Sequence, residues 1–167
     1  MEFLYLINDI KMGKLITVTA IILFTLTVSS YGQLAVGYNT DGNTLSLSTN
    51  PLNKLWGEFR INTKSYDQAG WSYNDRGITQ VYMMVNVFTA KNVSLYSGGG
   101  LGMNLLSKDE EKWVSVNVPV GLRMNPFAAL PDLYLVGEYN PMIIAVDKIP
   151  VIHTVSLGFR YILNKKQ

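Results

Sequence analysis

Regular alternation of apolar and polar residues limits what this chain can fold into more than any other feature of its sequence. In the segment 113–124, every second residue is aliphatic or methionine: Val114, Val116, Val118, Val120, Leu122 and Met124. The residues between them are Ser115, Asn117, Pro119, Gly121 and Arg123. Because successive side chains of a β-strand point to opposite faces, this pattern predicts a strand with one apolar and one polar face.

The pattern recurs along most of the chain after residue 32, interrupted by turn-rich or charged connections. It predicts eight strands, at 33–40, 43–50, 55–64, 78–90, 93–106, 112–124, 133–145 and 152–163. Asp41 and Gly42 favour a tight hairpin between the first two strands. Closed membrane barrels have an even number of antiparallel strands, and eight is the smallest number found. The sequence therefore predicts an all-β fold, an eight-stranded antiparallel up-and-down transmembrane β-barrel, over residues 33–167.

The composition of the two faces indicates which one points outward. One face is aliphatic and aromatic, whereas the other is dominated by Gly, Ser and Asn with few ions. A face exposed to water would be about a quarter to a third charged. We therefore expect the apolar face to contact lipid and the small polar residues to fill the interior. A soluble lipocalin-like barrel, with its apolar face around a ligand, is the alternative. Pro119 and Pro141 lack an N–H for the strand ladder and are expected at bulges or near strand ends.

The polar face carries a set of ions that would share the barrel interior: Glu58, Arg60, Arg123, Glu138 and Arg160. Ions at membrane depth have to pair or be hydrated, so we predict one salt-bridge cluster in the half of the barrel near the periplasmic ends of the strands. Six bulky residues are expected to fill the rest of the interior: Trp56, Tyr82, Met84, Phe88, Tyr96 and Trp113. Because side chains alone can fill an eight-stranded barrel, a plugged interior is favoured over a small-solute channel or transporter.

The N-terminal region has the pattern of a secretory signal peptide at 1–32. Lys11 and Lys14 precede the apolar run 15–28, and small residues follow it. We expect translation to start at Met12 and cleavage to follow Gly32.

Catalytic, cofactor and metal sites are not expected. The chain has no Cys and a single His, His153, which has no Ser on its own face and no acid near it in the strand. A net charge of +2 is too small to indicate binding of nucleic acid. The loop 65–77 carries Tyr66, Trp71 and Tyr73, which are suited either to contacts with an extracellular protein or glycan or to an interfacial aromatic girdle.

The signal peptide, the eight alternating strands and a final strand at 155–163, reading VSLGFRYIL, together resemble a known family. They are similar to the small outer-membrane β-barrels of Gram-negative bacteria, the OmpA-transmembrane/OmpX-like group. In that group an aromatic residue usually ends the last strand, whereas here Ile162 and Leu163 follow Tyr161. The resemblance implies a location in the cell outer membrane, contact with its lipid and lipopolysaccharide, and insertion by the barrel-assembly machinery. It also implies a structural or surface-interaction role without enzymatic activity.

Overall fold

The computed structural model describes residues 33–63, 66–68, 71–73, 78–104, 113–145 and 151–163. The expected signal peptide at 1–32, with its start at Met12 and its cleavage after Gly32, lies outside these residues. Within the described ranges, no helix is both long and apolar enough to cross a membrane.

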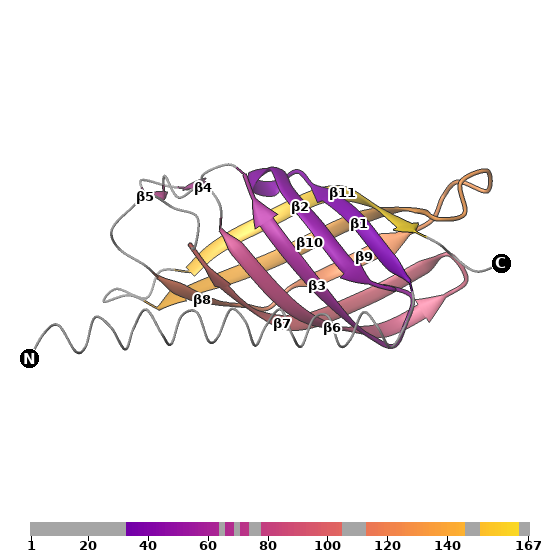
Figure 1. Cartoon of the computed structure of the whole chain (residues 1–167), viewed down its shortest axis with the longest axis horizontal. Coiled ribbons are helices and arrows are strands. Elements are labelled where there is room, and N and C mark those ends of the chain that lie inside the picture. Colours follow the sequence, from indigo (N-terminus) through magenta and orange to yellow (C-terminus); the bar gives the residue numbers. More distant parts are fainter. Residues whose placement is uncertain are drawn as a thin grey trace, which may run out of the picture. The chain divides into compact units, whose positions relative to one another are not determined.

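The described residues form a closed antiparallel barrel (Figure 1). Its strands are β1 (Leu34–Asn39), β2 (Thr44–Thr49), β3 (Leu55–Asn62), β6 (Thr79–Ala90), β7 (Val93–Met103), β8 (Val114–Asn117), β9 (Val120–Met124), β10 (Leu133–Ala145) and β11 (Val151–Leu163). Apart from β8 and β9, strands that follow one another in this series pair with each other, and β11 returns to pair with β1. β8 and β9 both lie between β7 and β10, so they are two parts of one strand. The predicted eight-stranded up-and-down barrel is therefore confirmed.

Several strands are shorter than the sequence predicts. β1 and β2 have six residues each, and a short 3-10 turn, η1 (Asp41–Asn43), joins them at the expected hairpin. Asn43 has a φ of 48°, in the left-handed region that Asn tolerates better than most residues. Between β3 and β6 lies a two-stranded hairpin that was not predicted, β4 (Tyr66–Gln68) paired with β5 (Trp71–Tyr73).

The two strand prolines are diagonal neighbours on adjacent strands, because the register places Pro141 opposite Val118 and Pro119 opposite Asn140. Pro119 falls in the break between β8 and β9, near strand ends as predicted. Pro141 lies well inside β10, so the expectation of a bulge or strand end is wrong for this residue. Register is the same on both sides of the break, since Tyr139 pairs with Val120 and Met142 with Asn117. The barrel thus confines both missing N–H groups to one short interruption of the ladder.

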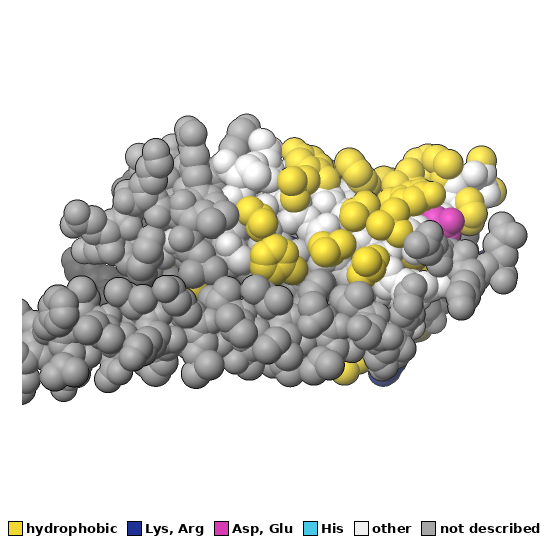
Figure 2. Space-filling model, in the orientation of Figure 1, with side chains coloured by type: hydrophobic (Ala, Val, Ile, Leu, Met, Phe, Trp, Pro, Cys, Tyr) yellow, Lys and Arg dark blue, Asp and Glu magenta, His cyan; other side chains and the backbone are white. Residues whose placement is uncertain are grey.

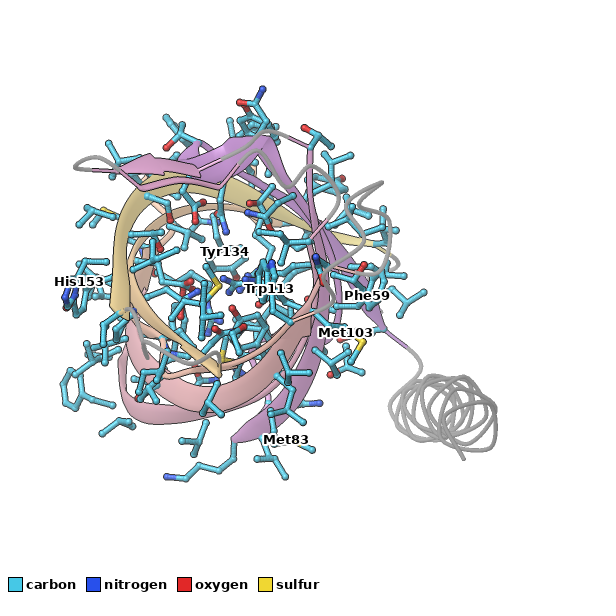
Figure 3. The ribbon with its side chains drawn as sticks, turned by 90° about the vertical axis from the view of Figure 1, so that its left-hand side faces the viewer. Phe59, Met83, Met103, Trp113, Tyr134 and His153 are labelled. Atoms are coloured by element: carbon cyan, nitrogen blue, oxygen red, sulfur yellow. The ribbon has the colours of Figure 1, made fainter. Side chains whose placement is uncertain are left out.

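The side chains follow the predicted division into an outer and an inner face. Exposed apolar residues occur on strands all around the barrel, and Val155 and Leu157 are the most exposed, at 76% and 69%. Figure 2 shows such side chains over the visible described surface. In the end-on view, Phe59, Met83, Met103 and His153 point away from the barrel, while Trp113 and Tyr134 point into it (Figure 3). This apolar outer face and the closed backbone ladder are what a lipid environment requires.

Phe88 is the exception among the predicted interior residues. Its side chain is 59% exposed, and the preceding Val87 is 58% exposed. The register between β6 and β7 shifts at this point, because Asn86 pairs with Tyr96 whereas Phe88 pairs with Leu95. One extra residue at a bulge reverses the alternation of all residues that follow. The prediction for Phe88 is wrong for this reason.

Candidate functional site in the barrel interior

Strand alternation places four of the five interior ions on three strands. Glu58 and Arg60 lie two residues apart on β3 and share its inner face, while Glu138 lies on β10 and Arg160 on β11. None of these side chains is more than 4% exposed. The closed barrel thus holds four charged groups away from water, and their stability depends on the contacts they make with each other.

These four residues form a continuous chain of ion pairs. Arg160 donates from Nη2 to Oε1 of Glu58 over 2.6 Å, and the other Glu58 oxygen accepts from Nη2 of Arg60 over 2.9 Å. Arg60 also binds Glu138 through two parallel contacts of 2.5 and 2.8 Å. Such bidentate pairing between a guanidinium and a carboxylate is among the strongest side-chain interactions. The chain joins β11, β3 and β10 across the lumen.

Two tyrosines extend this network to further strands. Tyr96 on β7 donates its hydroxyl proton to Oε2 of Glu138 over 2.7 Å. The Tyr82 ring on β6 lies 4.4 Å from Cζ of Arg60, and its hydroxyl accepts from Nδ2 of Asn140 over 2.8 Å. The charged groups are therefore covered by aromatic rings and held from five strands, as a packed interior requires.

Glycines create the space for these tyrosines. Gly121 pairs with Tyr96 across the β7–β9 ladder, and Gly100 pairs with Tyr82 across the β6–β7 ladder. A Cβ atom built on Gly121 would overlap the Tyr96 ring, and one on Gly100 would overlap the Tyr82 ring. The glycines are needed here because the rings lie directly against the backbone.

This packing gives a matched pair of substitutions. We expect Gly121→Ala to lower the free energy of unfolding by about 1–3 kcal/mol, because the added methyl group displaces the Tyr96 ring that binds Glu138. Gly99→Ala is the control, since a Cβ there has nothing within 4 Å, and we expect a change within about 0.5 kcal/mol. Urea unfolding of both variants in vesicles measures the difference. Equal midpoints would show that Tyr96 is not held as described.

Arg123 lies in the interior but is not part of the ion-pair chain. It is 1% exposed, and no carboxylate of the described residues forms an ion pair with it. Its Nη2 donates to Oδ1 of Asn86 over 3.3 Å, and its Cζ lies 5.8 Å from the Tyr134 ring centroid. The structure thus brings four of the five predicted ions into one network and places the fifth beside it.

An apolar layer lies at the end of the lumen where β3 and β6 are joined. Its buried members are Ile78, Trp113, Met142, Ile144 and Ile152. They lie at the ends of the strands that lead to the connections 63–78, 104–113 and 145–151. A solute entering from this side would meet apolar side chains before reaching the ions.

The remaining predicted site residues lie outside this interior. Tyr66 belongs to β4, and Trp71 and Tyr73 belong to β5; their side chains lie outside the described part of the structure. His153 is on the outer face, where Nδ1 lies 2.7 Å from the Tyr139 hydroxyl oxygen and the two rings stack with centroids 6.0 Å apart. Within the described ranges, no group of three or more His, Asp or Glu residues could hold a metal ion.

Sequence reasoning missed the hydrogen-bonding role of the interior tyrosines. It assigned Tyr82 and Tyr96 as bulk that fills the lumen, whereas they bind Asn140 and Glu138. The opposing glycines are a usable signal, because an aromatic residue and a glycine of the same face on adjacent strands can pair in this way. Using that signal requires the register between strands, which alternation alone does not supply.

The fold and its interior define a class, that of the eight-stranded membrane β-barrels whose lumen is filled by side chains. No protein-family model and no curated protein sequence matches the chain. Among solved structures it is similar to the N-terminal barrel domain of Pseudomonas aeruginosa OprF, with 9% identity, a TM-score of 0.49 and coverage of 78% of this chain and 96% of that one.

The chain is also similar to two structures of the Yersinia pestis outer membrane protein Ail. The structure in a phospholipid bilayer nanodisc has 20% identity and a TM-score of 0.44, with 78% of this chain and 97% of Ail covered. The crystal structure has 18% identity and a TM-score of 0.42, with coverage of 78% and 94%. The assignment of the fold rests on the strand pairing described above.

Proposed function

We propose that this protein is an integral barrel of a bacterial outer membrane, with a structural or surface-interaction role and no catalytic activity. The observation that carries the proposal is the apolar outer face, which includes Leu45, Met83, Leu101 and Leu157, each at least 50% exposed. Contiguous apolar surface of this extent on a soluble monomer would promote association. A lipid bilayer removes this surface from water around the whole barrel.

The interior supports a role that does not depend on conduction. Four ions pair across the lumen, and an apolar layer covers one end. A constitutive pore would require these buried contacts to open, with several charged groups losing their partners. The barrel therefore acts as a rigid support, and any specific contact is made by the segments that connect its strands.

The segment 65–77 is the best candidate for such a contact. In Figure 1, its β4–β5 hairpin lies at the end of the barrel opposite the C-terminal end of β11. It contains Tyr66, Trp71 and Tyr73, residue types that are enriched in protein interfaces. We propose that this hairpin contacts an extracellular protein or glycan. The same aromatics would serve only as an interfacial girdle if no such contact exists.

Substitution of the three aromatics by serine tests this role. We expect cells that express the triple variant to adhere to immobilised glycoprotein about tenfold less than cells with the unchanged barrel. The matched control replaces Phe127, which is exposed at the other end of the barrel, by serine and is expected to leave adhesion unchanged. The three proteins have to be present in equal amounts on the cell surface. Unchanged adhesion of the triple variant would assign the aromatics to the girdle.

A further inference from the structure

The charges that are fully buried in the barrel interior do not balance. The fully buried ions of the described residues are the carboxylates of Glu58 and Glu138 and the guanidinium groups of Arg60, Arg123 and Arg160, which leaves an excess of one positive charge among them. Arginine stays protonated in proteins, so this excess cannot be removed by loss of a proton. An unpaired ion at this depth is costly unless a counter-ion or water compensates it.

Every oxygen of the two carboxylates already accepts from Arg60 or Arg160, and none forms an ion pair with Arg123. Both Glu58 oxygens accept from Arg160 and Arg60. Both Glu138 oxygens accept from Arg60, and one of them also accepts from Tyr96. The ion-pair chain therefore engages every carboxylate oxygen and leaves Arg123 without an ion pair among the described residues.

A set of buried N–H donors without an acceptor in the described structure lies in the same region. It comprises Nε and Nη1 of Arg123, Nε and Nη1 of Arg160, and Nε1 of Trp56. Cζ of Arg160 lies 4.7 Å and Cζ of Arg123 lies 6.0 Å from the Trp56 ring centroid, so the three side chains adjoin one another. Each is at most 2% exposed. Buried N–H donors on adjoining side chains, without an acceptor in the described structure, are suited to binding an anion.

Neighbouring residues fix Arg123 in this position. Asn86 accepts from Nη2 of Arg123, and its own amide nitrogen donates to the carbonyl oxygens of Pro51 and Asn53 in the β2–β3 turn. The rings of Tyr96 and Tyr134 lie about 6 Å from Cζ of Arg123. In Figure 3, Tyr134 points into the lumen. The site is therefore assembled from β3, β6, β7, β9, β10 and β11 and does not depend on a flexible side chain.

We propose that the lumen binds one small monovalent inorganic anion, of the chloride type, at Arg123, Arg160 and Trp56. One negative charge neutralises the excess of one positive charge, whereas a divalent anion would reverse its sign. The faces of the surrounding rings repel an anion because they carry the negative part of the ring quadrupole, so the anion contacts the N–H groups. The bound anion completes the charge balance of the interior and stabilises the barrel.

Thermal unfolding of the detergent-refolded barrel tests the proposal, with chloride titrated against gluconate at constant ionic strength. We expect the melting temperature to rise with chloride by at least about 2 °C and then to level off, as for a ligand that binds only the folded state. Arg123→Met removes the excess charge and is expected to abolish this rise. The control Lys54→Met removes one exposed positive charge outside the lumen and is expected to retain it.

A second measurement does not depend on the folding of a variant. Crystals of the unchanged barrel grown with bromide are expected to show an anomalous peak within hydrogen-bonding distance of Arg123 or Trp56. A melting temperature that is independent of chloride, together with no bromide peak in the lumen, would overturn the proposal. An equal chloride response in Arg123→Met would overturn it as well, because the stabilisation would then arise elsewhere.

Discussion

Glu138→Gln is expected to destabilise the barrel by about 3–5 kcal/mol, the usual cost of removing one partner of a buried ion pair. The substitution takes the carboxylate from both contacts with Arg60 and weakens the contact with Tyr96. It also raises the excess interior charge from one to two. The difference in unfolding midpoint between the variant and the unchanged barrel, measured in urea and phospholipid vesicles, gives the size of the effect.

The double variant Glu138→Gln with Arg60→Met separates this charge effect from a loss of packing. The double variant restores the excess of positive charge in the interior to one. We therefore expect its loss of unfolding free energy to be smaller than the sum of the losses in the two single variants. Planar-bilayer recordings of Glu138→Gln are expected to show no current, because the remaining side chains still fill the lumen. Unchanged stability, or steady currents from this variant, would contradict the description of the network as a packed plug.

Leu157→Arg is expected to cost about 2–4 kcal/mol of barrel stability in vesicles, because an arginine at the middle of the lipid-facing surface has to be desolvated. Leu157 is the central residue of β11 and is 69% exposed. Val151, on the same face at the end of β11, is the matched control. Val151→Arg is expected to cost about 0–1 kcal/mol, since an arginine near the interface reaches water.

The comparison of these two variants distinguishes a membrane barrel from a soluble one. On a water-exposed surface, both substitutions would change stability by no more than about 0.5 kcal/mol. The loss of unfolding free energy in Leu157→Arg and in Val151→Arg is measured by reversible unfolding, once in vesicles and once in a detergent of shorter chain length. Equal small effects at positions 151 and 157 would contradict the lipid-facing assignment.

The alternation of apolar and polar residues was sufficient to predict the strands and their faces. Side chains of a strand alternate with a period of two, so the apolar set can only face either the lipid or the interior. It placed Glu58, Arg60, Glu138 and Arg160 inside and Val155 and Leu157 outside, where the structure has them. Its error at Phe88 comes from the bulge after Asn86, since one extra residue reverses the parity and leaves little trace in the sequence.

The pairing of the interior ions could not be predicted to the same extent. All five lie at similar distances from the strand ends, so counting along the strands grouped Arg123 with the others. Which carboxylate meets which guanidinium depends on the stagger between strands that are far apart in the chain, such as β3 and β10. The proximity of Pro119 and Pro141 has the same origin, because it follows from the register of β10 with β8 and β9.

Membrane fractionation of cells that express the full-length chain tests the central claim most directly, followed by electrophoresis of the detergent-extracted protein with and without boiling. We predict recovery in the outer membrane and a change in mobility on boiling, because a closed barrel stays folded in the unboiled sample. A soluble periplasmic protein with no change in mobility would contradict the account, and the apolar residues would then have to line a cavity instead of facing lipid.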